Sequence, residues 1–334
     1  MSNKQKTIAA LKAVRGNGVA WLLSHLNADG SLGDPTEGFH FYRAPWTFAI
    51  VGETGPAAAV CSWIRREMLT EQGRIEGPFR VFDDAYAYRN ATLIVGAHLA
   101  RQYDLSHGLM PDLLACQDRT SGGFHNDRTA QGGMSDRMDV PYACGPGLAC
   151  LATGRLDITR SVYRFLHRIY SAQPNLPERF YYAWSSRKSG VITGFSDDDG
   201  FWHVVENHAD RPQRWTVGGI AAGFLCRLYL ADPRPEYLAL ARHYQAFSMA
   251  ATDAQFKYAQ VCKSSWGSSL LYQLTGERAY LEWSCRMGDW YVQTQEPEGC
   301  WHWTGYETQG SRIELTLEFV MHVDTLIGGL ASRT

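Results

Sequence analysis

The most constraining feature of this sequence is a series of helix-like segments whose connections alternate between short and long. Twelve stretches carry apolar residues at helical spacing and are closed by Gly, Pro or polar residues. These stretches are residues 5–26, 43–51, 56–69, 90–103, 108–116, 140–152, 156–170, 216–230, 235–250, 255–274, 278–294 and 312–330. Convincing strand alternation is absent, so we expect an essentially all-α chain.

The connections between these segments predict how they pair. Residues 52–55, 104–108, 153–157, 231–235 and 275–278 form short turns, whereas 27–42, 70–89, 118–139, 171–215 and 295–311 are long. Three short turns lie in similar contexts, LATGRLDITRSVYRFL, LYLADPRPEYLALARHY and YQLTGERAYLEWSCRM. The similarity indicates an internal repeat of helical hairpins with a spacing of about fifty residues.

Six such hairpins that pack side by side and close predict an all-α (α/α)6 barrel, or toroid, over residues 1–334 as a single domain. Alternate helices then form an inner and an outer ring, with every long loop on one face before an inner helix. Because binding and catalysis concentrate in loops on a rigid scaffold, we expect the site at this face. Residues 171–215 would be a long insertion loop on the active-site side. An open solenoid of the same hairpins is the alternative.

Composition narrows the class of partner. Lys+Arg 32 against Asp+Glu 34 gives a net charge of −2, which does not suit nucleic acid or an anionic membrane. No apolar run approaches the roughly 18 residues of a membrane span, and residues 1–6 are polar, unlike a signal peptide. The eight cysteines include no CxxC pair, so we expect reduced thiols in a cytoplasmic protein. A small-molecule substrate is the expected partner, and the oligomeric state is left open.

A second repeat marks three of the long loops. The sequences WLLSHLNADGSLGD, LLACQDRTSGGFHN and WYVQTQEPEGCWHW each end a helix with polar residues, then Gly, then an apolar or aromatic residue. These motifs resemble the QW-type repeats of the terpenoid cyclase and protein prenyltransferase superfamily of α–α toroids. The resemblance implies that Gln117 and Gln295 cap helix ends over the aromatic residues Phe124 and Trp301. Sugar-processing (α/α)6 barrels share the layout.

The catalytic motifs of that superfamily are not matched. Its class II cyclases protonate an alkene with DxDD, but here Ser196 replaces the first acid before Asp197, Asp198 and Asp199. A DDxxD motif for magnesium and diphosphate would begin at Asp83 and Asp84, but the third acid is missing. No convincing Asp, Cys and His trio for zinc is present. We therefore expect no cofactor and no metal.

The candidate catalytic residues come from two long loops. Adjacent carboxylates repel, so one of Asp197, Asp198 and Asp199 could stay protonated if it is desolvated, and His203 could exchange a proton with it. Asp83 and Asp84 form a second acidic pair before a predicted inner helix. The alternative for the first cluster is a solvated Asp-Asp-Asp-Gly turn.

The candidate substrate-binding residues are aromatic or polar side chains at predicted loop–helix junctions. Aromatic rings there would make a pocket that suits a polyene, a polycyclic compound or a sugar ring. The set is Trp46, Tyr86, Tyr88, Arg89, Asp139, Tyr142, Trp184, Trp202, Arg214, Trp215, Trp266, Trp301, Trp303, Glu314 and Glu318. Glu314, Glu318 and His322 are spaced four apart on one helix face, which lines either the lumen or solvent. Asn90 is expected to cap its helix, and Asp139 is either a cap or a site residue.

Three hypotheses for function follow. The first is a cofactor-independent cyclase or isomerase, possibly pericyclic, that folds an apolar terpenoid- or polyketide-like intermediate in an aromatic pocket. The second is a carbohydrate-active lyase, hydrolase or epimerase that uses Asp and His as acid and base. In this second hypothesis Arg179, Arg214 or Arg312 would hold a carboxylate. The third is a non-catalytic binding toroid.

Overall fold

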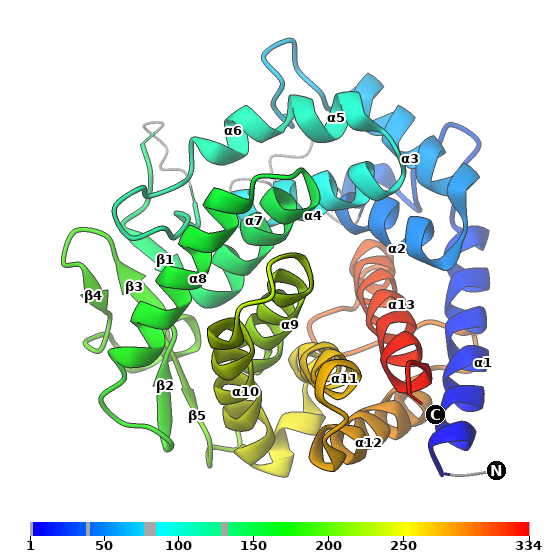
Figure 1. Ribbon diagram of the computed structural model, residues 1–334. Coiled ribbons are helices and arrows are strands. Elements are labelled where there is room, and N and C mark those ends of the chain that lie inside the picture. The colour runs from blue at the N-terminus through cyan, green and yellow to red at the C-terminus, as the bar shows by residue number, and fades with distance from the viewer. Residues whose placement is uncertain (1–2, 38–40, 77–84, 128–132, 334) are drawn as a thin grey trace.

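Inner and outer helices alternate along the chain in the computed structural model, which describes residues 3–37, 41–76, 85–127 and 133–333 (Figure 1). The inner helices are α2 (Ala44–Val51), α4 (Tyr86–Leu99), α7 (Val140–Ala152), α9 (Thr216–Ala231), α11 (Lys263–Thr275) and α13 (Gln309–Ala331). The outer helices are α1 (Asn3–Ser24), α3 (Thr54–Glu67), α5 (Tyr103–Gly108), α6 (Met110–Leu114), α8 (Leu156–Ser171), α10 (Pro235–Ala250) and α12 (Arg278–Thr294). Burial follows this division, because α7 is buried from Val140 to Cys150 whereas α8 buries a single stripe.

The inner helices form a closed ring. Each contacts the next in the order α2, α4, α7, α9, α11, α13, and α13 returns to α2. The first outer helix, α1, packs against both α12 and α13, and Arg15 on α1 pairs with Asp324 on α13. The predicted closed (α/α)6 barrel is therefore confirmed, and the open solenoid is wrong.

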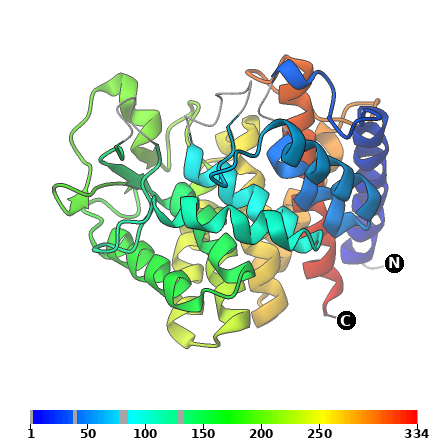
Figure 2. The same ribbon diagram turned by 90° about the horizontal axis from the view of Figure 1, so that it is seen from above.

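The long connections lie on one face of the ring, as predicted. In Figure 2 the blue loop after α1 and the orange loop before α13 lie close together, and 3-10 helices η1 (Pro35–Glu37) and η2 (Phe41–Arg43) contact α13. The 3-10 helices η5 (Asp253–Lys257) and η6 (Ala259–Cys262) precede α11. The predicted helix 255–274 therefore begins late, at Lys263, because these two turns occupy its first residues.

The loop repeat is a recurring backbone turn after the outer helices. In each copy a glycine with positive φ donates its N–H to a carbonyl oxygen three or four positions earlier. The bonds join Gly30 to Asn27, Gly73 to Thr70, Gly122 to Asp118 and Gly299 to Glu296. A Cβ on Gly30, Gly122 or Gly299 would lie within 2.7 Å of a backbone oxygen on the next outer helix. Gly299 meets Asn17 of α1, so this turn also closes the ring. The copy at Gly73 was not among the three that the sequence predicted, although Ile75 follows it as Leu32 follows Gly30.

Replacement of Gly122 tests this turn. Gly122 has φ +88°, and an added Cβ would lie 2.3 Å from the Ser161 carbonyl oxygen. Gly154 is a matched control, since its φ is +78° but nothing lies within 4 Å of its Cβ position. Gly154→Ala should lower the free energy of unfolding by about 1–2 kcal/mol, through backbone strain alone. Gly122→Ala should cost a further ~1–3 kcal/mol in urea unfolding because a helix must shift, and equal costs would contradict this role.

Within the described parts of the long loops lie five short strands, where the sequence predicted none. They are β1 (Arg137–Asp139), β2 (Arg179–Tyr181), β3 (Ala183–Ser185), β4 (Gly190–Val191) and β5 (Val204–Glu206). One antiparallel sheet has the order β1-β3-β4, with Met138 opposite Trp184, and β2 pairs with β5, with Phe180 opposite Val205. Strands of two or three residues are too short to show alternation. Strands β2 to β5 lie within the predicted insertion 171–215 and give this loop a defined backbone conformation.

Two expectations at helix starts are decided by the structure. Helix α4 begins at Tyr86, so Asn90 lies inside it, buried, and donates from Nδ2 to the Tyr86 carbonyl oxygen at 2.9 Å. The predicted cap at Asn90 is wrong, because the helix extends one turn further toward its N-terminus. Asp139 does cap α7, accepting from the Tyr142 N–H at 2.8 Å.

All eight cysteines are buried free thiols. Across the described ranges, every helix is too short or too polar to span a membrane.

Candidate active site

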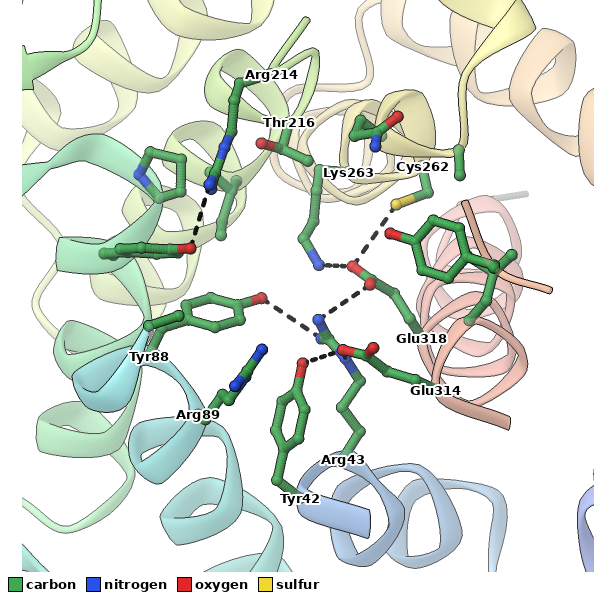
Figure 3. A pocket seen from close by; sticks show the side chains of 18 of the residues that line it. Tyr42, Arg43, Tyr88, Arg89, Arg214, Thr216, Cys262, Lys263, Glu314 and Glu318 are labelled. Atoms are coloured by element: carbon green, nitrogen blue, oxygen red, sulfur yellow. Dashed lines mark hydrogen bonds and ion pairs between the residues drawn. The ribbon is translucent and has the colours of Figure 1, made fainter. Parts of the chain in front are cut away.

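A cavity of about 220 Å³ lies at the centre of the ring, on the long-loop face (Figure 3). Every inner helix, or the turn before it, contributes to its wall. The lining residues are Tyr42, Arg43, Ala85, Tyr88, Arg89, Pro141, Tyr142, Phe201, Arg214, Thr216, Ile220, Ala259, Gln260, Cys262, Lys263, Tyr306, Glu314, Leu315 and Glu318. The volume is below the roughly 300–1,000 Å³ of most ligand pockets, which favours a small ligand.

One wall of the cavity is a carboxylate face on α13. Glu314 and Glu318 are one turn apart and point into the cavity, with His322 buried one turn further. The Arg43 guanidinium lies between the carboxylates, with Nη2 3.0 Å from Glu318 Oε2 and Nε 3.5 Å from Glu314 Oε1. The Tyr42 hydroxyl donates to Glu314 Oε1. This wall is therefore ionic rather than apolar.

A buried lysine completes the wall. The Lys263 ammonium donates to Glu318 Oε1 and lies 3.1 Å from His322 Nε2. Its backbone position depends on Gly219, where a Cβ would lie 2.2 Å from the Lys263 carbonyl carbon. Burial opposes a charge on Lys263, but the Glu318 carboxylate outweighs burial and raises the pKa of the lysine. Burial likewise opposes ionisation of Glu318, yet Arg43 and Lys263 hold its pKa well below the usual range.

His322 is neutral near neutral pH. Burial, and then the Lys263 ammonium, lower its pKa from 6.5 to about 4. A neutral Nε2 accepts a hydrogen bond from the Lys263 ammonium, so the histidine helps to hold the lysine in position. The Trp266 ring packs against the imidazole with ring centroids 5.7 Å apart.

The lowered pKa of His322 predicts a pH dependence of stability. Because the unfolded chain protonates this histidine at higher pH than the folded chain, stability is full above pH 6.5 and falls as pH drops toward 4. The contribution is about 3 kcal/mol at most. Urea unfolding across this window should show the loss, and His322→Gln should flatten it. An equally steep loss in His322→Gln would assign the dependence to other groups.

Three groups of this wall, Cys262, Glu318 and His322, are of the types that bind metal ions. Cys262 Sγ, a Glu318 oxygen and a His322 ring nitrogen all lie within 4.8 Å of one another. The Lys263 ammonium, however, already contacts both Glu318 and His322, in the place a cation would take. Burial and the nearby Glu318 raise the pKa of Cys262, so it is a thiol rather than a metal-binding thiolate. The trio is satisfied by the lysine and does not fit a metal.

The opposite wall combines cations with aromatic rings. Arg214 stacks on Trp202, Tyr142 and Phe201, with its guanidinium carbon 4.3, 5.0 and 5.4 Å from the ring centroids. Its Nη2 donates to the Tyr142 hydroxyl at 3.2 Å. Arg89 also lines the cavity, with its guanidinium carbon 6.0 Å from the Tyr42 ring.

The structure brings six of the predicted site residues to the lining of this cavity. The six are Tyr88, Arg89, Tyr142, Arg214, Glu314 and Glu318. A seventh, Trp202, reaches the site by stacking on Arg214. Asp83 and Asp84 lie outside the described residues.

The acidic run of the longest loop is outside the cavity. Asp197, Asp198 and Asp199 start an exposed 3-10 helix, η4 (Asp197–Trp202), and Asp197 lines a separate surface hollow of about 270 Å³. The His203 Nδ1 contacts the Asp199 carbonyl oxygen at 2.9 Å, and its ring stacks on Phe195. These contacts are those of the solvated turn that the sequence left open as the alternative.

The remaining predicted residues pack or cap in the structure. The two Asp139 oxygens accept hydrogen bonds from the Tyr142 N–H and from Asn126 Nδ2. Among the other residues, Tyr86 donates to Asp112, Trp184 packs on Phe165, Trp301 packs on Phe319, Trp46 packs on Trp266, Trp303 donates to the Lys257 carbonyl oxygen, and Trp215 is buried.

Sequence reasoning missed Arg43, Cys262 and Lys263. A usable signal existed for Lys263, because it is followed by the uncharged residues Ser264-Ser265-Trp266-Gly267 in a predicted inner helix. A lone charge in a helix of that kind is rarely buried unless it is paired.

Comparison with known proteins supports the fold. No family model and no curated protein matches this sequence. Among solved structures, a D-mannose isomerase superposes with a TM-score of 0.69 at 15% identity, covering 95% of this chain and 96% of the other. A glycoside hydrolase family 76 mannosidase from Bacteroides thetaiotaomicron gives 0.63 at 10% identity, with 96% and 98% covered. A type II terpene cyclase from Scytonema gives 0.62 at 11% identity, with 98% and 99% covered. At these low identities the three similarities show a shared α/α toroid fold.

Proposed function

We propose that this chain is an enzyme that removes a proton from the carbon next to the carbonyl of a small sugar. Return of the proton to the neighbouring carbon isomerises the sugar, and return to the same carbon epimerises it. The observation that carries the proposal is the arrangement of Glu314 beside Arg43, and of Glu318 between Arg43 and Lys263, in a small cavity. This is a form of the second sequence hypothesis, with different acid–base residues.

Glu314 is the general base in this proposal. Among the described residues, its contacts with Tyr42 and Arg43 both fall on Oε1, so the carboxylate is held in position by one oxygen. Oε2 can then take the proton from the carbon next to the sugar carbonyl. The electron pair of the broken C–H bond forms an enediolate on the two neighbouring carbons. The remaining hydroxyl proton then passes between the two enediolate oxygens, and Glu314 returns its proton to the former carbonyl carbon, which gives the isomer. Return of the proton to the original carbon from the other face would give the epimer.

The cations stabilise the enediolate. Arg43 and Lys263 are fixed before the reaction by Glu318, so their charge needs no reorganisation when negative charge develops on the substrate oxygens. The raised pKa of Lys263 keeps it an ammonium, which disfavours a Schiff base with the sugar carbonyl. Glu318 holds the cations, and His322 holds Lys263.

The competing reactions fit the cavity less well. Glycoside hydrolysis needs a protonated carboxylic acid, whereas Arg43 and Lys263 keep Glu318 ionised. In the first sequence hypothesis, a cyclase would bind a hydrocarbon against Arg43, Lys263 and two glutamates. These charged groups would then lose their contacts with water and gain no polar contact from the substrate, which is unfavourable. The D-mannose isomerase neighbour supports a sugar isomerase, while the terpene cyclase neighbour keeps the cyclase as the second candidate.

An interconversion assay tests the proposal. The full chain is incubated with single pure aldoses, ketoses and uronic acids, and products are separated by chromatography. We expect at least one sugar to be converted to its isomer or epimer up to an equilibrium mixture that is also reached from the product. Conversion of none of them, or release of a smaller sugar from an oligosaccharide instead, would contradict it.

A further inference from the structure

We propose that the wall around Arg214 is a subsite for a carboxylate, so that the sugar turned over is a sugar acid. This inference rests on the proposed function for the identity of the sugar, but it is carried by a different part of the cavity. In Figure 3 Arg214 projects from the side of the cavity opposite Glu314 and Glu318. One small ligand could therefore reach both walls.

Arg214 differs from Arg43 in its ion pairs. Arg43 has two carboxylates within 3.5 Å. Arg214 has no ion-pair partner among the described residues, and its buried Nε, like that of Arg43, makes no hydrogen bond. A guanidinium withdrawn from water without an anion is costly, so the site is completed when a ligand supplies one.

Asp139 forms no ion pair with Arg214. Burial opposes the charge on Arg214, while Tyr142, Tyr182 and then Asp139 raise its pKa. The two Asp139 oxygens instead accept from the Tyr142 N–H and from Asn126 Nδ2. Asp139 thus orders Tyr142, which holds the guanidinium at 3.2 Å. The aromatic rings of Trp202 and Phe201 cover the guanidinium plane and leave its edge for the ligand.

The first turn of α9 adds to the same subsite. Thr216, the first residue of the helix, lines the cavity beside Arg214, and Trp215 at the N-cap supplies no side-chain hydrogen bond. A helix of 16 residues directs its positive end at this wall. The guanidinium fork binds carboxylate and phosphate oxygens alike, but its single positive charge balances one carboxylate and not a phosphate dianion.

The sequence offered three arginines for a carboxylate, and the structure separates them. Arg179 pairs with Glu206 at 2.9 Å and lies on the separate surface hollow. Arg312 donates to Cys300 Sγ at 3.0 Å. Arg214 is the one of the three that lines the central cavity.

Calorimetric binding at constant ionic strength tests the subsite. The probes are D-glucuronate, D-galacturonate and D-mannuronate, each against its neutral hexose and its hexose 6-phosphate. At least one uronate should bind about ten- to a hundredfold tighter than its hexose, the value of a charge-assisted hydrogen bond. Arg214→Gln should bring that uronate down to the affinity of the hexose, and Arg214→Lys should keep part of the preference.

The controls separate this inference from the proposed function. Arg211→Gln, which alters an exposed arginine paired with Glu206 in the same loop, should leave the preference intact. Glu314→Gln should also keep it, because the preference needs no turnover. Selective binding of a uronate with no formation of an isomer or epimer would contradict the proposed function and still support the subsite. Equal binding of uronates and hexoses, tighter binding of the phosphates, or an equal loss for both sugars in Arg214→Gln would overturn the subsite.

Discussion

Replacement of Glu314 by Gln is expected to slow sugar interconversion by about 10²–10⁴-fold, the usual value of a general base. The amide has the same shape, and its oxygen can still accept the hydrogen bond from the Tyr42 hydroxyl. What it loses is the ability to take a proton from carbon. The loss should therefore appear in kcat, measured with the sugar that the wild-type chain converts.

A matched glutamate controls for the change of charge. Glu282→Gln alters an exposed residue that pairs with Arg278 on α12, far from the cavity lining, and should leave kcat unchanged. Thermal unfolding of both variants should match that of the wild-type chain. Retention of more than about a tenth of the wild-type kcat in Glu314→Gln would remove this residue from the role of base.

Replacement of Lys263 by Met is expected to lower the free energy of unfolding by about 3–5 kcal/mol, because it breaks a buried ion pair from one side. Glu318 would keep only Arg43, and His322 would lose its donor. The double variant Lys263→Met with Glu318→Gln should recover part of the loss, since no uncompensated carboxylate then remains. Urea unfolding of the single and double variants measures this coupling.

The control for Lys263 is an exposed lysine. Lys257 pairs with Asp210 on the surface, and Lys257→Met should leave the free energy of unfolding essentially unchanged. If the Lys263 and Lys257 variants were equally stable, the ionic wall would not be part of the folded core.

The architecture could be predicted from the sequence because its signals are local. Helical periodicity and the alternation of short and long connections do not depend on distant partners, and both were confirmed. The strands could not be predicted, since Arg137 to Asp139 is extended only through pairing with residues about 45 positions later. The start of α11 at Lys263 likewise depends on packing against Gly219 of α9.

The site was predicted only in part for a physical reason. The spacing of Glu314, Glu318 and His322 gave a common face, but whether that face met the lumen or solvent depended on Arg43 and Lys263 from other hairpins. The Asp197 to Asp199 run stood out in the sequence by its density of charge. In the structure that density marks exposure, whereas the buried charges occur singly in apolar contexts.

Deuterium incorporation tests the central claim most directly. The full chain is incubated in D2O with the sugar that it converts, and the C–H signals next to the carbonyl are followed by NMR. Proton transfer at carbon through Glu314 predicts that deuterium enters one of these positions in wild-type samples and is lost from Glu314→Gln samples. Conversion with no deuterium at either carbon, at early or late times, would contradict transfer through an exchangeable carboxylate and with it the proposed mechanism.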